Sequence, residues 1–395
     1  MSSTFPNGFL WGAATASHQV EGGNVNNDFW EMEHRPDTFF AEPSGDACDS
    51  WHRWEEDLDI VAELGLNTYR FSLEWSRIEP EAGEVSRAAL DHYRRMIAGC
   101  RDRGLNPVVT LQHFTVPRWM TAGGGWAASG SADRFARYCE TVLPILAEGV
   151  SHVCTINEPN LAAMTAQLHL PSTGEPSPFP GSMPPPHQPT ADALIAAHAR
   201  ATEILHSRPG LAVGWTVASQ VVQAAPGAEE AAAAWSRRRE DIFLEAAKND
   251  DFIGVQAYTR TVVGPDGALP VPETTERTLT DWEYYPQALE QAVRHAWRTT
   301  GGVPVLVTEN GIATADDTRR IDYARTALHG LRAAMDDGID VRGYIHWSLL
   351  DNFEWVAGYK PTFGLVAVDR QTFARTPKPS AHWLGTIART GQLAD

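Results

Sequence analysis

The feature that most restricts the fold of this sequence is a regular alternation of two hydrophobic patterns. Eight short runs are rich in apolar and β-branched residues, and segments between them carry apolar residues at helical spacing. Such alternation indicates a parallel sheet, and eight units close a (β/α)8 barrel, the TIM-barrel fold. The expected strands are Phe9–Ala14, Thr68–Leu73, Pro107–Leu111, His152–Ile156, Ala212–Val217, Phe252–Val255, Val305–Val307 and Gly343–Trp347.

Six helices are expected between these strands. The structural alternative is an open, doubly wound sheet, but the glycine-rich turn G-x-G-x-x-G that would support it is absent from the sequence. Barrels of this type often reach 395 residues, so the chain, 1–395, is expected to form one domain. The expected helices are Trp51–Leu64, Ala88–Arg103, Ala191–Ser207, Glu229–Asn249, Tyr285–Thr299 and Ile321–Asp337.

One segment, Leu170–Pro189, is dense in proline, glycine and serine. The strand and helix patterns resume directly after it, so it is expected to be a long loop at the barrel mouth and not a linker between domains. Long loops without regular structure are usually functional or disordered.

Composition argues against polyanionic partners. Lysine and arginine total 32 against 50 acidic residues, a net charge of −18, which disfavours nucleic acid and anionic membranes. No apolar run reaches membrane-spanning length, and the first nine residues lack a signal-peptide pattern. Cys48, Cys100, Cys139 and Cys154 lack metal-ligand spacing and are expected to be free thiols. We therefore expect a cytoplasmic protein, and the oligomeric state stays open.

Two glutamates stand where catalytic groups of a barrel are found, at the carboxyl ends of strands. Glu158 follows the fourth strand in Asn157-Glu158-Pro159, and Glu309 follows the seventh in Glu309-Asn310. Glycoside hydrolysis requires such a pair, with the carboxyl groups about 5–5.5 Å apart when the anomeric configuration is retained. Each could instead be a buried structural acid, but two at complementary strand ends favour catalysis.

The other strand ends are also polar or aromatic. A neutral polyol binds through hydrogen bonds to its hydroxyls and through stacking on an aromatic face. Taken singly, His113 and Trp347 are more typical of a core, so the hypothesis depends on their convergence with the rest. The residues concerned are Gln19, Arg70, His113, Tyr258, Trp347, Glu354 and Trp355.

At this point the sequence resembles glycoside hydrolase family 1, the β-glucosidase family. The resemblance lies in Phe9–Gly22, Leu64–Ser72, Thr155–Pro159, Val307–Gly311 and Trp347–Trp355 and covers nearly the whole chain. It implies that Glu158 is the general acid/base and Glu309 the nucleophile, with Arg70 and Tyr258 orienting the nucleophile. It also implies which residues bind the substrate. Those at the sugar hydroxyls are Gln19, His113, Asn157, Glu354 and Trp355, while Trp347 lies beneath the sugar and Trp282 beside the aglycone.

The activity that the resemblance implies is hydrolysis of a β-glucoside, β-galactoside or β-fucoside with retention, without metal or cofactor. Glu354 and Trp355 stand where a phosphosugar branch has serine, so an unphosphorylated sugar is expected. Some positions depart from the family pattern and are expected to affect substrate recognition: Phe114, Thr115, Asn160, Gln256 and Ala257. A specialised natural-product deglycosylase or transglycosylase, and a non-catalytic sugar-binding barrel, remain alternatives.

Overall fold

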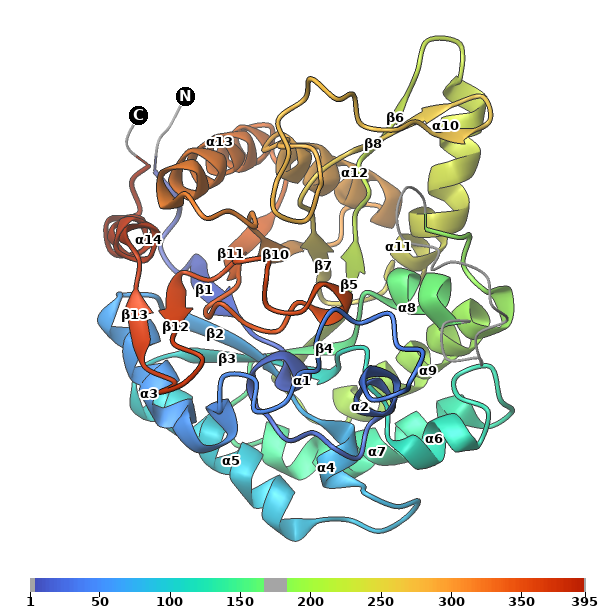
Figure 1. Ribbon diagram of the computed structural model, residues 1–395, viewed down its shortest axis with the longest axis vertical. Helices are drawn as coiled ribbons and strands as arrows, with labels where there is room; N and C mark the ends of the chain where they lie inside the picture. Colours follow the sequence, from blue (N-terminus) through green and yellow to red (C-terminus); the bar gives the residue numbers. More distant parts are fainter. Residues whose placement is uncertain (1–3, 167–182, 394–395) are drawn as a thin grey trace.

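The computed structural model describes residues 4–166 and 183–393, and its centre is a closed barrel of eight parallel strands. The ring order is β1-β2-β3-β4-β5-β7-β10-β11, closing on β1, and Figure 1 shows it encircled by helices. The barrel strands are β1 (Leu10–Ala14), β2 (Thr68–Ser72), β3 (Asn106–Gln112), β4 (His152–Asn157), β5 (Ala212–Ala218), β7 (Ile253–Gln256), β10 (Val305–Asn310) and β11 (Val341–Trp347). The predicted (β/α)8 fold is confirmed.

All eight predicted strands are present, with small differences at their ends. Every residue of β2 and β10 is buried, because strands of a parallel barrel are covered on both faces. The largest difference is in β10, which continues beyond Val307 to Asn310. It continues because Glu309 pairs with Gln256 of β7 and Asn310 with His346 of β11, so polar residues still complete the ladder.

Five predicted helices match single helices in the structure: α3 (Ser50–Glu63), α5 (Arg87–Asp102), α9 (Gln188–His206), α12 (Ala288–Thr300) and α13 (Asp317–Asp336). The sixth, predicted as Glu229–Asn249, is divided into α10 (Glu229–Ser236), a π-helical turn (Arg237–Asp241) and α11 (Ile242–Ala246). Within the turn, Glu240 is buried and its carboxylate accepts a hydrogen bond from the Ser219 hydroxyl over 2.6 Å. A π turn inserts a residue into a helix and so redirects its side chains.

Two helices that the sequence reasoning missed complete the outer layer, α7 (Ser131–Leu146) and α14 (Pro379–Thr390). Buried Phe135, Tyr138 and Val142 of α7 have the three- and four-residue spacing that indicates a helix, so the signal was present. An isolated β-bridge joins Thr4 to Gln392, so the first and last described segments of the chain pair with each other.

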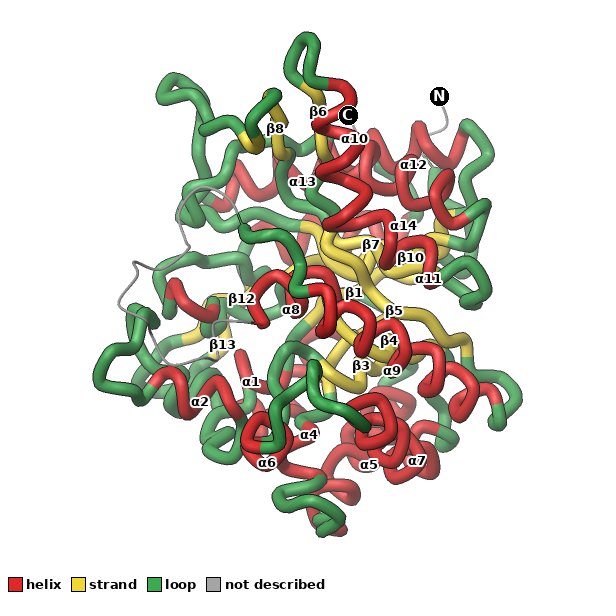
Figure 2. Tube along the Cα trace, turned by 90° about the vertical axis from the view of Figure 1, so that its right-hand side faces the viewer, coloured by secondary structure: helices red, strands yellow, loops and turns green. Residues whose placement is uncertain are grey.

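Short elements follow the carboxyl ends of most barrel strands and surround the mouth. In Figure 2, β6 and β8 stand apart from the yellow barrel strands. The short helices are α1 (Ser17–Val20), α2 (Asp28–Glu33), α4 (Trp75–Ile78), α6 (Arg118–Ala122), α8 (Pro159–Thr165) and a 3₁₀ turn (Trp355–Ala357), and the short strands are β6 (Val222–Ala224), β8 (Thr261–Gly264), β9 (Gly267–Ala268), β12 (Val366–Val368) and β13 (Arg375–Pro377).

The core has two main parts. A small cluster that includes Val108, Cys154, Leu306 and Ile345, one each from β3, β4, β10 and β11, fills the barrel interior. A larger cluster packs the strands against the helices. None of the described helices has the length and apolar character needed to cross a membrane.

The proline-rich segment Leu170–Pro189 is placed only in part. Its residues 170–182 lie outside the described residues, so the predicted loop stays a prediction there. Its last two residues are not loop, because Gln188 and Pro189 form the first turn of α9. Proline is tolerated in this turn, where a backbone N–H has no partner within the helix.

Candidate active site

The two predicted catalytic glutamates both lie buried at the carboxyl ends of barrel strands. Glu158 follows β4 and precedes α8, with its backbone in the left-handed region (φ 45°, ψ 57°). Its backbone N–H donates to the carbonyl oxygen of Thr216 over 2.8 Å, which fixes this turn. Glu309 lies within β10. A left-handed glutamate is strained backbone of the kind that clusters at functional sites, which supports the interpretation of Glu158 as more than a structural acid.

Two donors hold the carboxylate of Glu309. The guanidinium of Arg70, from β2, donates to Oε1 over 2.5 Å, and the hydroxyl of Tyr258 donates to Oε2 over 2.6 Å. Arg70 and Tyr258 thus contact the nucleophile candidate as predicted. A cation and a hydroxyl donor both favour the ionised form of a carboxyl group.

The surroundings give the two glutamates unequal acidities. Burial, and next the negative charge of Glu309, raise the pKa of Glu158 well above its ordinary value, while Arg70 opposes the rise. Burial also raises the pKa of Glu309, but Arg70 and Tyr258 oppose that rise by charge and by hydrogen bonds. Because the hydrogen bonds fall only on Glu309, a proton taken up by the pair resides on Glu158. The site then contains one neutral acid and one carboxylate.

Three buried polar atoms of the residues predicted to bind the sugar, which we call the sugar shell (Gln19, His113, Asn157, Trp347, Glu354 and Trp355), have no hydrogen-bond partner among the described residues. They are Oε1 of Gln19, Nδ1 of His113 and Oε1 of Glu354. Their side chains are otherwise anchored. The amide nitrogen of Gln19 donates to the Phe353 carbonyl over 2.7 Å, and Trp347 hydrogen-bonds to the carboxyl group of Glu354. Buried polar atoms almost always have partners, so these three indicate a polar ligand.

Trp355 is fixed within a group of rings. His18 and His113 are nearly parallel to its indole, at centroid distances of 5.8 and 6.1 Å. The rings of Phe29 and Phe114 meet it edge-on at 5.0 and 5.2 Å. Such packing leaves the indole little rotational freedom, so its orientation toward a ligand is set before binding.

Trp282 is the most exposed of the predicted site residues, at 40 %. It lies in the segment after β9, and its ring centroid is 5.7 Å from that of Tyr258 and 6.4 Å from that of Phe363. Since Tyr258 binds Glu309, this exposed indole borders the site, where an aromatic surface for an aglycone was predicted.

Some of the departures from the family pattern have structural roles. The hydroxyl of Thr115 donates to the buried carboxylate of Glu74 over 3.0 Å. The amide of Asn160 is occupied by backbone groups, including N–H and C=O of Ala218. Phe114, in contrast, packs against Trp355 and therefore contacts the sugar shell. Thr115 and Asn160 therefore have structural contacts of their own, and the effect of these departures on substrate recognition stays a prediction.

Two threonines inside the barrel were missed by the sequence reasoning. Thr110 of β3 accepts a hydrogen bond from Nε of Arg70 over 3.1 Å, and Thr216 of β5 donates to Oδ1 of Asn157 over 3.0 Å. Each interrupts an apolar strand run with a polar group that must find a partner inside the core. That interruption was the available signal.

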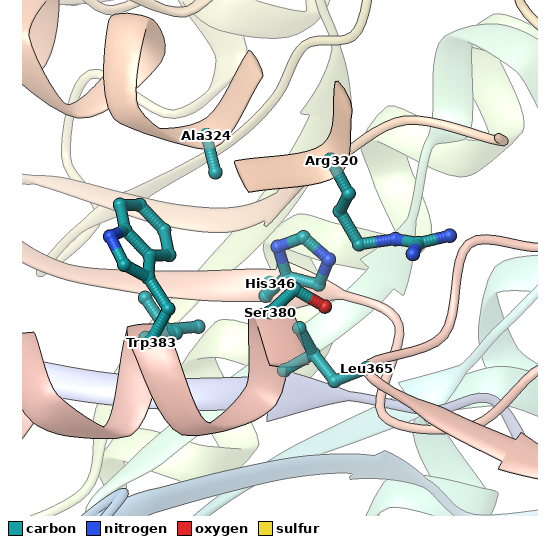
Figure 3. Close-up of a pocket in the computed structure, with 7 residues that line it drawn as sticks. Arg320, Ala324, His346, Leu365, Ser380 and Trp383 are labelled. Atoms are coloured by element: carbon teal, nitrogen blue, oxygen red, sulfur yellow. The ribbon is translucent and has the colours of Figure 1, made fainter. Parts of the chain in front are cut away.

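A narrow gap lies elsewhere, between β11 and the outer helices α13 and α14. Figure 3 shows His346, Arg320 and Trp383 around it, and it has no room for a water molecule. Among residues 4–166 and 183–393, no group of three or more histidine, cysteine or acidic side chains is arranged to hold a metal ion.

The geometry agrees with comparisons to known proteins. The chain matches the profile of Glycosyl hydrolase family 1 over residues 1–263 and 247–392. It is 30% identical to the 1,4-beta-D-glucan glucohydrolase of Thermotoga neapolitana (99% of each chain) and 30% identical to the bifunctional beta-D-glucosidase/beta-D-fucosidase of Bifidobacterium breve (97% of this chain, 98% of the relative). The crystal structure of beta-glycosidase BGL167 is 49% identical, with a TM-score of 0.90 over 99% of this chain and 98% of that one. The chain therefore belongs to glycosyl hydrolase family 1.

Proposed function

We propose that this retaining glycosidase removes a terminal β-D-glucosyl residue from the non-reducing end of its substrate, with β-D-fucosides and β-D-galactosides as further substrates. The observation that carries the proposal is the unequal pair of buried glutamates at the ends of β4 and β10. Relatives named beta-glucosidase A and bifunctional beta-D-glucosidase/beta-D-fucosidase support this substrate class.

In the proposed mechanism the carboxylate of Glu309 attacks the anomeric carbon while Glu158 protonates the departing oxygen. A covalent glycosyl-enzyme forms and the aglycone leaves as an alcohol. Glu158, now ionised, removes a proton from water, which attacks the same carbon and releases Glu309. Two inversions give net retention. During the second step Glu309 is an ester without charge, so its repulsion of an ionised Glu158 has disappeared.

We assign binding of the sugar to the buried polar atoms that lack partners. Oε1 of Gln19 and Oε1 of Glu354 are suited to accept from hydroxyl groups, and Nδ1 of His113 is suited to bind another. Trp347 offers a flat surface to the apolar face of the ring, and Trp355 a second indole beside it. An acidic side chain at position 354 offers no cation to a 6-phosphate, which supports an unphosphorylated sugar.

The comparisons favour hydrolysis over the two alternatives, a natural-product transglycosylase and a non-catalytic sugar-binding barrel. We further propose that residues 1–395 act as one catalytic domain and that no metal or organic cofactor takes part.

All four cysteines are free and buried, which supports a reducing compartment such as the cytoplasm. The acidic net charge of −18 supports an enzyme without nucleic-acid partners.

The direct test is the Glu309→Gly variant with an aryl β-glucoside. We expect it to lose nearly all turnover, and azide or formate to restore part of it by occupying the space of the missing carboxylate. The product formed with azide should have the α configuration, because only one inversion then takes place. Glu84→Gly, which removes an exposed acid, is the matched control and should behave as wild type. Unchanged turnover in Glu309→Gly would refute the assignment.

A further inference from the structure

Asn157, which directly precedes Glu158, receives an unusual number of hydrogen bonds on one atom. Its Oδ1 accepts from Nη2 of Arg70 over 2.5 Å, from the hydroxyl of Thr216 over 3.0 Å and from Nε2 of Gln256 over 2.9 Å. Thr216 lies near the end of β5 and Gln256 ends β7, and β4, β5 and β7 lie side by side in Figure 1. The three donors therefore approach from two sides of the barrel.

These contacts fix the direction of the amide. A guanidinium can only donate, so the atom of Asn157 that faces Arg70 must be the oxygen. The Nδ2 group consequently points away from the three donors, and it lies 3.2 Å from Nε2 of His113. All five residues of this network are buried, with exposures of 0–4 %, so water does not compete for these positions.

The fixed amide also determines which nitrogen of His113 carries the proton. Nδ2 of Asn157 is a donor, so Nε2 of His113 must be the acceptor of their bond and the proton must lie on Nδ1. Burial and the charge of Arg70 lower the pKa of His113 well below its ordinary value, so the ring is neutral. Its Nδ1–H is the atom without a partner, and is thus a donor available to a sugar oxygen.

The same arginine that fixes the Asn157 amide also connects it with the nucleophile. Arg70 bridges Asn157 and Glu309, with one nitrogen on each. Because Glu309 attacks C1 of the sugar in the proposed mechanism, an amide held next to that nucleophile is suited to bind the neighbouring hydroxyl, on C2. Hydrogen bonds to this hydroxyl strengthen in the transition state of glycoside hydrolysis.

We infer that Gln256 is a positioning residue: with Thr216 and Arg70 it holds the Asn157 amide so that Nδ2 faces the 2-hydroxyl of the sugar and Nε2 of His113. This rests on the proposed function. Arg70 alone would determine which side of the amide carries the oxygen, but a single contact leaves the Asn157 side chain free to rotate. Gln256 and Thr216 donate from the neighbouring strands and restrict this rotation. A contact made only through a well-placed donor is lost when the donor is displaced by about 1 Å.

The test compares two substrates in wild type and Gln256→Leu: 4-nitrophenyl β-D-glucoside and its 2-deoxy analogue. We expect the variant to lose about tenfold in kcat/KM on the glucoside, mainly in kcat, and to stay within about twofold on the 2-deoxy substrate. Gln223→Leu, which removes a partly buried amide of β6, is the matched control and should leave both values unchanged. An equal loss on both substrates, or no loss on either, would overturn the inference.

Thr216→Val provides a second variant of nearly unchanged shape if Gln256→Leu does not fold. It removes another donor to the same oxygen, so the same selective loss is expected, and a uniform loss or none again counts against the inference. In wild type, ¹⁵N NMR of labelled histidine should show the His113 proton on Nδ1, and a proton on Nε2 would overturn it. Failure of the proposed function is distinct, because wild type would then not cleave the glucoside.

Discussion

Arg70 and Glu309 form a buried ion pair in which Nη1 lies 2.5 Å from Oε1, with side-chain exposures of 0 % and 5 %. Removing two charges from water is costly unless their remaining polar atoms are satisfied. Tyr258 satisfies the second oxygen of Glu309, while Thr110 and Asn157 accept from the remaining nitrogens of Arg70. This pair therefore serves to keep the nucleophile ionised and oriented.

The pH dependence of kcat/KM should have two limbs. Activity requires Glu309 to be ionised and Glu158 to be protonated, so the alkaline limb follows Glu158. Because burial and Glu309 raise the pKa of Glu158, this limb should lie well above the ordinary range of a glutamate. In Glu158→Gln, assayed with a 2,4-dinitrophenyl glucoside that needs no protonation to leave, the alkaline limb should disappear. If the alkaline limb persists in this variant, a group other than Glu158 is responsible for it.

Tyr258→Phe should shift the acidic limb to higher pH. The hydroxyl of Tyr258 lowers the pKa of Glu309, so its removal lets burial raise that pKa further and leaves less ionised nucleophile. We expect kcat/KM to fall about 10- to 100-fold, the effect of a hydrogen bond to a charged group. Tyr285→Phe is the control, since the hydroxyl of Tyr285 bonds Gln223 and Gln291 outside the site. An unmoved acidic limb would show that the bond does not tune Glu309.

The Glu158→Gln variant should be more stable than wild type at neutral pH, and this difference should grow as the pH rises from 4. The folded pKa of Glu158 is above its unfolded value, so the stability that its neutral form provides is complete below the unfolded pKa. That stability is lost as the pH rises toward the folded pKa, because the unfolded chain releases the proton first. Glutamine does not titrate, so the variant should gain a few degrees (~2–4 °C) in Tm at neutral pH and nothing at pH 4. The exposed Glu84→Gln should show no such trend.

Trp282→Ala should weaken binding of aryl glucosides selectively. The exposed indole beside Tyr258 provides a stacking surface outside the sugar site. We expect KM for 4-nitrophenyl β-D-glucoside to rise about 3- to 10-fold and KM for methyl β-D-glucoside to stay unchanged. Trp282→Phe keeps a flat ring and should recover most of the loss. A similar rise for both substrates would place Trp282 at the sugar and not at the aglycone.

Secondary structure could be predicted where one hydrophobic face governs a segment. The barrel strands and five helices were predicted because burial on one or both faces imposes a spacing that is visible locally. The division of Glu229–Asn249 was not predictable in this way. Its π turn accompanies burial of Glu240 against Ser219, a residue on another segment, and such a contact leaves no mark on local spacing.

The sequence by itself determined the alternation of strands and helices, hence the barrel, and the placement of Glu158 and Glu309 at strand ends. These follow from hydrophobic spacing and from the rule that parallel strands end at a common face. The resemblance implied which glutamate is the acid, but only the tertiary structure gave the physical reason why the proton stays on Glu158. That choice depends on Arg70 and Tyr258, which lie far from Glu309 in the chain and reach it because the barrel closes. Distances across a closed barrel are set by packing, so no pattern along the chain records them.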